Sequence, residues 1–154
     1  YEAANRGTYQ IQNVVTGDAK AGEAFFNGPG GCTACHSVTG DLAHVASKYQ
    51  PVELQAAFLY PAAVSRLAGA GGHQLPTPEV TVTLSSGQSY TGKLKRLDDF
   101  VVSLYDSAGN YHSWTRGPGV TVTVKDPLTG HLKLLGQYTD ADMHNVLAYL
   151  VTLK

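Results

Sequence analysis

The sequence predicts an α+β protein in which a helical part is interrupted by a block of short strands. Apolar residues recur at helical spacing in two segments, with Leu54 and Phe58 on one face of the first and a longer stripe at 143–151 in the second. Apolar and polar residues alternate between positions 80 and 124. The length of 154 residues is that of one domain, or of one domain that carries a small insert. We therefore expect a small helical domain with an inserted β subdomain.

The first helix is expected at 17–26. Asp18 occupies its capping position, where a carboxylate accepts a hydrogen bond from an unpaired backbone amide. Gly22 lowers the helix propensity in the middle of this segment, and we expect a close crossing with another helix to compensate for it.

Two more helical segments follow. Gln50–Leu67 has Pro51 in its first turn, and Pro61 is expected to kink or divide it. Near the end of the chain, Thr139–Asp142 resembles a capping box. It is followed by an apolar stripe that predicts an amphipathic helix: Met143, Val146, Leu147, Leu150 and Val151.

The block between these helices has the pattern of strands. β-branched and aromatic residues alternate with polar ones in five short runs, and turn-forming residues separate the runs. We expect an antiparallel meander, curled into a small barrel or sheet, whose role is packing or docking. The runs are Val80–Leu84, Ser89–Lys95, Phe100–Tyr105, Tyr111–Thr115 and Val120–Val124.

Composition and charge exclude several classes of protein. Hydrophobic residues make up 43% of the chain, which excludes a disordered or collagen-like chain. The formal net charge of -1 predicts no binding to nucleic acid or to an anionic membrane. No apolar run approaches the roughly 18 to 20 residues that a membrane span needs. The chain begins at Tyr1 without a charged and then apolar leader, so we expect any export signal to have been removed or left off.

The segment Cys32-Thr33-Ala34-Cys35-His36 is the attachment signature of c-type haem. Two thiols at this spacing can add to the two vinyl groups of one macrocycle, and His36 then becomes the proximal iron ligand. The preceding run Asn27–Gly31 allows the backbone to lie close to a flat ligand. We therefore expect one covalently attached haem c.

Two other interpretations of Cys32 and Cys35 have less support. A zinc site would need two more ligands, but these are the only cysteines of the chain and a suitably spaced histidine pair would have to follow. A redox-active dithiol of the thioredoxin type would open a helix after a strand, and no such pattern surrounds this motif.

Together with the helices, the motif resembles class I cytochrome c. The resemblance covers residues 17–67 and 127–154 and implies the all-α cytochrome c fold, with the first and last helices crossing at Gly22 and Tyr149. The chain departs from the family in lacking a Met-Pro pair before the last helix and in carrying the block of strands. The matching segments are Gly17-Asp18-Ala19, Gly22, Phe25-Phe26, Cys32 to His36, Gly40-Asp41-Leu42 and Leu147-Ala148-Tyr149-Leu150.

The resemblance also implies a division of the chain. Residues 1–16 form an N-terminal extension, 17–76 and 126–154 form the cytochrome c domain, and 77–125 form the inserted β subdomain.

The motif leaves the sixth iron ligand open. In the family this ligand is a methionine on a loop shortly before the last helix, and the corresponding position before Thr139 is Gly130–His131. His131 is therefore our first choice of distal ligand. The second choice is Met143, which is the only methionine of the chain, and the third is His73. The remaining histidines are expected at the surface, beside a haem propionate or in structural positions: His44, His112 and His144.

The resemblance implies an electron carrier rather than an enzyme. Its partner would be a redox protein, such as a periplasmic dehydrogenase or an oxidase, bound through a modest and transient contact. Because covalent haem attachment follows export, we expect a periplasmic or otherwise exported protein. Two alternatives remain: a haem-based sensor or peroxidase-like enzyme with an open sixth site, and a docking module of a larger redox complex. The sequence does not determine the oligomeric state.

Overall fold

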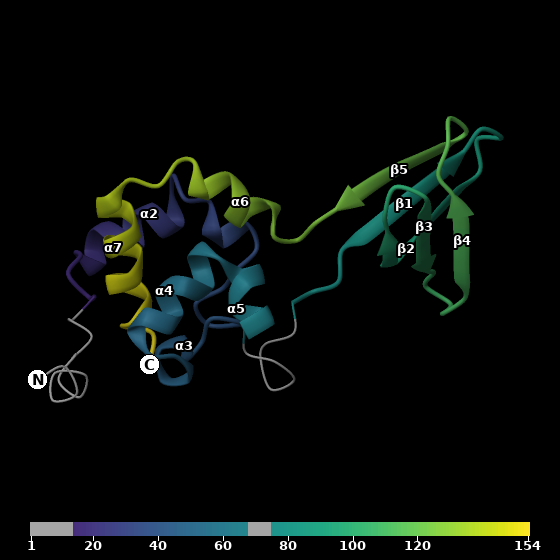
Figure 1. Cartoon of the computed structure of the whole chain (residues 1–154). Helices are drawn as coiled ribbons and strands as arrows, with labels where there is room; N and C mark the ends of the chain where they lie inside the picture. The colour runs from purple at the N-terminus through teal and green to yellow at the C-terminus, as the bar shows by residue number, and fades with distance from the viewer. Residues whose placement is uncertain (1–13, 68–74) are drawn as a thin grey trace, which may run out of the picture. The chain divides into compact units, whose positions relative to one another are not determined.

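The computed structural model of the chain describes residues 14–67 and 75–154 (Figure 1). These residues form two compact units, a helical unit at 14–67 and 130–154 and a β unit at 75–129. Each unit has its own cluster of buried apolar side chains. The protein is therefore α+β, and this part of the predicted fold class is confirmed.

The first and last helices begin where the sequence predicts. Asp18 caps the first helix by accepting a hydrogen bond of 2.7 Å from the amide of Ala21. Thr139 and Asp142 cap the last helix reciprocally, with amide-to-side-chain bonds of 2.9 and 3.1 Å. The helices are α2 (Ala19–Asn27), the 3-10 turn η1 (Cys32–Ala34), α3 (Val45–Lys48), α4 (Pro51–Leu59), α5 (Pro61–Leu67), α6 (Thr129–Leu135) and α7 (Asp140–Leu150).

The middle segment is divided at Pro61, as predicted. α4 begins at Pro51, and the Gln50 amide donates a 2.9 Å bond to the carboxylate of Glu53. α4 ends at Leu59, and Pro61 opens α5, where the missing amide of proline costs no helical hydrogen bond.

Helices α2 and α7 cross at Gly22. An added Cβ at this position would lie 1.9 Å from the carbonyl oxygen of Asn145 and 2.9 Å from Cβ of Tyr149, so only glycine permits this approach. The rings of Phe26 and Tyr149 meet edge to face at the same crossing, with centroids 5.6 Å apart. The Asp18 amide also donates a 2.8 Å bond to the side chain of Asn145. The predicted crossing of the first and last helices is confirmed.

The core of the helical unit joins α2, α4 and α7. Leu54 and Phe58 are buried on one face of α4, as the spacing of α4 predicts. None of the described helices is long and apolar enough to cross a membrane. The buried side chains of this core are Phe26, Val45, Leu54, Phe58, Val146, Leu147, Tyr149 and Leu150.

The β unit is one antiparallel sheet of five strands, and all five were predicted within two residues of their ends. In the order of the sheet they are β4 (Tyr111–Thr115), β3 (Val101–Tyr105), β2 (Ser89–Leu97), β1 (Glu79–Leu84) and β5 (Val120–Lys125).

The meander prediction is correct for the first four strands and wrong for β5. That strand returns to pair with β1, with Val82 opposite Val122 and Val80 opposite Val124. β1 therefore lies inside the sheet, with β2 on one side and β5 on the other, and its Val80 and Val82 side chains are fully buried. Strands β4 and β5 are the edges, so among the described residues no pairing between them closes a barrel.

Candidate functional site

The Cys-x-x-Cys-His segment forms a short turn after α2. Gly31 has φ = 58°, a left-handed conformation that glycine adopts without strain, and it leads the chain into η1. The Cys32 thiol is half-buried against the helical core, and burial raises its pKa, whereas Cys35 is exposed. The amide of His36 closes the turn with a 2.9 Å bond to the carbonyl of Cys32.

The ring of His36 is held by a carboxylate. Its Nδ1–H donates to Oδ2 of Asp41 at 2.5 Å, and the Ser37 amide donates to Oδ1 of the same carboxylate at 2.8 Å. Burial alone would raise the pKa of Asp41, but the bonds from His36 and Ser37 outweigh it, so the pKa lies below its ordinary value. In the neutral imidazole this contact places the proton on Nδ1, so the lone pair of Nε2 is available to a metal.

His131 lies close to His36, although the two residues are far apart in the sequence. Their ring centroids are 5.8 Å apart, and the ring planes are inclined by 73°. Nδ1–H of His131 donates to the carbonyl oxygen of Phe58 at 2.8 Å, and the ring is half-buried. The Nε2 of neither ring has a hydrogen-bond partner in the part of the chain that the structure describes.

These distances fit two imidazoles that share one metal. A metal lies about 2 Å from each imidazole nitrogen, so two rings on opposite sides of it have centroids about 6 Å apart. The donor set also fits haem, because a porphyrin fills four positions of its iron and leaves two axial positions for protein ligands. Among residues 14–67 and 75–154, no cluster of three or more His, Cys, Asp or Glu side chains is arranged to hold a metal ion by itself.

His131 was chosen by its place before Thr139, and the structure places this residue in the short helix α6. The helix forms because Asp126 organises the turn before it. Its carboxylate accepts a 2.8 Å bond from the amide of Leu128, and its carbonyl oxygen accepts one of 2.8 Å from the hydroxyl of Thr129. Asp126 followed directly by Pro127 is a helix-start signal in the sequence, and it could have predicted α6.

Aromatic rings form an apolar wall beside Cys32. Tyr138 stacks on Phe25 with centroids 5.6 Å apart and meets Phe58 edge to face at 6.1 Å. Burial, reinforced by the negative charges of Cys32 and Asp142, raises the pKa of Tyr138 to about 12. Neither Tyr138 nor the Phe58 carbonyl was identified from the sequence, although aromatic residues near a haem motif are a usable signal.

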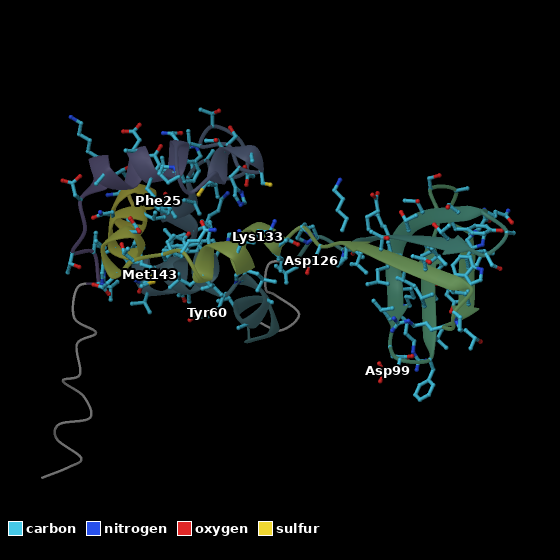
Figure 2. The ribbon with its side chains drawn as sticks, turned by 90° about the horizontal axis from the view of Figure 1, so that it is seen from above. Phe25, Tyr60, Asp99, Asp126, Lys133 and Met143 are labelled. Carbon is cyan, nitrogen blue, oxygen red and sulfur yellow. The ribbon has the colours of Figure 1, made fainter. Side chains whose placement is uncertain are left out.

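His131, the first candidate for the distal ligand, has its ring next to that of His36. Met143 is half-buried on α7, and its amide bonds the carbonyl of Thr139 at 3.2 Å (Figure 2). The third candidate, His73, lies outside the described residues.

The remaining histidines have other surroundings. His44 is exposed at the start of α3 with φ = 59°. His112 donates from Nε2 to Asp106 at 2.8 Å and stacks on Trp114 at 5.8 Å, which is a structural role in the β unit. The ring of His144 lies 3.2 Å from the Thr16 hydroxyl.

No protein-family model matches the chain, and no curated protein matches its sequence.

Proposed function

We propose that this chain is a mono-haem c-type cytochrome that carries single electrons between redox partners. The observation that carries the proposal is the His36–His131 pair, with 5.8 Å between ring centroids and the first ring directly after Cys-x-x-Cys. When bound, the haem iron supplies a one-electron couple between its ferrous and ferric states.

Each residue of the site has a defined task in this proposal. Cys32 and Cys35 would hold the porphyrin through thioether bonds, and His36 and His131 would be the protein ligands of its iron. Asp41 and the Phe58 carbonyl orient the two imidazoles before any metal is bound, because each accepts the Nδ1 proton of its ring. Two protein ligands held in advance in this way would let electron transfer proceed with little movement of atoms.

We also propose the cytochrome c fold for the helical unit. Support comes from the chain order of α2, the haem motif, α4, α5 and α7, and from the crossing of α2 with α7 at Gly22. In this proposal the β unit is an insert between α5 and α6.

The partners are proposed from the same site. Cys35 is exposed, so the haem edge attached there would be open to a redox partner, such as a dehydrogenase or an oxidase.

Because the maturation of c-type haem follows export, the location would be periplasmic or otherwise extracytoplasmic. Two histidine ligands would give a lower potential than a histidine and a methionine.

The test is an absorption spectrum and an intact mass of protein produced together with haem-attachment machinery. We expect one haem per chain, a low-spin spectrum in both oxidation states and no sulfur-to-iron band in the red region. That band would favour Met143 over His131. A sharp spectral change on adding dilute cyanide or carbon monoxide would favour the sensor or peroxidase alternative. Colourless protein with two unmodified thiols would overturn the proposal.

A further inference from the structure

We infer that Asp41 is a positioning residue that lowers the reduction potential of the iron by acting through His36. The inference rests on the proposed function, since it requires His36 to bind haem iron. Asp41 lies outside the segment Cys32–His36, so its carboxylate would have a redox task that the attachment motif does not indicate.

The first support is the short contact between the two side chains. Charge-assisted N–H···O bonds are typically about 2.7–2.9 Å long. Nδ1 of His36 and Oδ2 of Asp41 lie 2.5 Å apart, so the ring donates its proton to a negatively charged acceptor. An imidazole polarised in this way is more basic at Nε2, the atom that faces a metal.

The second support is that the carboxylate is fixed in place. Its other oxygen accepts the Ser37 amide at 2.8 Å, and the turn is closed by bonds of 3.1 Å from the amides of Gly40 and Leu42 to the Ser37 carbonyl. Asp41 therefore reaches His36 from within one five-residue turn and needs no rearrangement to do so. Its side chain is 51% exposed, so water screens part of its charge.

The third support is the contrast between the two axial candidates. His131 donates its Nδ1 proton to a neutral carbonyl, that of Phe58, whereas His36 donates to a negative charge. A more basic ligand stabilises the ferric state, which carries the larger positive charge, over the ferrous state. The lowering of the potential therefore originates on the His36 side of the site.

The experiment compares Asp41→Asn with Asp140→Asn in the holoprotein. Asparagine keeps the size of the side chain and an oxygen that can accept a hydrogen bond, but it removes the charge. Asp140→Asn removes the same charge from an exposed residue of α7 in the same unit. Haem content by mass, the low-spin spectrum and the midpoint potential from redox titration are measured for the wild type and both variants.

We expect Asp41→Asn to favour reduction about tenfold, a rise of about 59 mV for one electron, and Asp140→Asn to have little effect. Haem-loaded, low-spin variants with equal midpoint potentials would overturn this inference and leave the proposed function intact. Wild-type protein with unmodified thiols would instead overturn the proposed function, and this inference with it.

A second measurement applies if Asp41→Asn does not mature. In ferrous His131→Ala protein, the stretching frequency of the bond from iron to His36, read by resonance Raman spectroscopy, rises with the negative character of the imidazole. We expect a higher frequency than in a five-coordinate ferrous haem c peptide, whose histidine has no carboxylate partner. An equal or lower frequency would overturn the inference.

Discussion

One hydrogen bond determines which nitrogen of His131 is available to a metal. Because Nδ1–H donates to the Phe58 carbonyl at 2.8 Å, the lone pair is on Nε2. A side chain that is oriented in advance loses little entropy when it binds, so this contact favours His131 as the distal ligand.

We predict that His131→Ala keeps its covalent haem, because both cysteines remain, but loses the low-spin spectrum. The sixth position would then accept added imidazole or cyanide, which titrations followed by absorbance would detect. The control is His144→Ala, which removes an imidazole on α7 whose contacts are with Thr16 and Asp140. A low-spin spectrum in His131→Ala would contradict this assignment.

The candidate residues Cys32, Cys35 and His36 follow from the sequence alone, because they are adjacent in a motif with one dominant chemistry. The sequence also led to His131, by its place before Thr139. It did not lead to the Phe58 carbonyl, because a backbone acceptor has no residue type to recognise.

At the scale of the helix, Gly22 determines how closely α2 and α7 approach. We predict that Gly22→Ala destabilises the protein, because its Cβ would lie 1.9 Å from the carbonyl oxygen of Asn145. Overpacking of this kind costs roughly 1–3 kcal/mol, more than the gain of about 1 kcal/mol in helix propensity. Urea unfolding followed by far-UV circular dichroism measures the change.

The matched control for Gly22→Ala is Gly136→Ala. Its added Cβ has ordinary contact distance to the nearest atom, 3.8 Å to the Lys133 carbonyl oxygen. Equal stability of the two variants would show that the α2–α7 crossing tolerates a methyl group.

At the scale of the hairpin, Asp106 organises the turn between β3 and β4. The pKa of its carboxyl is lowered from 3.8 to about 2 by the bond from His112 and then by bonds from Asn110 and Ala108. Since the folded pKa lies below the unfolded one, the carboxylate contributes stability above pH 3.8. That contribution is lost as the pH falls from 3.8 to about 2.

We therefore predict that Asp106→Asn makes the stability of the β unit less dependent on pH between these two values. The fluorescence of Trp114, the only tryptophan of the chain, reports on this unit in urea titrations at several pH values. The exposed Asp99, labelled in Figure 2, provides the control Asp99→Asn in the same unit. An unchanged pH profile in Asp106→Asn would disprove this role for the carboxylate.

At the scale of the whole molecule, the two hydrophobic cores are separate. In the proposed cytochrome, attached haem would add several hundred Å² of apolar surface to the helical core, worth about 10 kcal/mol at about 25 cal/mol per Å² before entropy costs. We predict that Cys32→Ala/Cys35→Ala loses covalent haem and that its helical unit is poorly folded. The Trp114 transition of the β unit would change much less.

Circular dichroism and Trp114 fluorescence, recorded in one urea titration of the double variant, distinguish the two units. A double variant that carries a full complement of haem and unfolds as the wild type does would contradict the attachment chemistry.

The strands were predictable from alternation, but their order in the sheet was not. Val120–Val124 has the same period-two pattern whether it lies beside β4 or beside β1. What selects β1 is the burial of Val80 and Val82, and burial depends on contacts between residues that are distant along the chain.

The pairing of β1 with β5 has a consequence for how such a chain can arise. Glu79 lies opposite Lys125, so the polypeptide enters and leaves the sheet at neighbouring points, about 5 Å apart. A module whose two ends meet in this way can be spliced into a surface loop of another protein, or removed again, in one genetic event. A smaller protein could therefore gain a five-strand unit of this kind by insertion into one surface loop, with the rest of its domain unchanged.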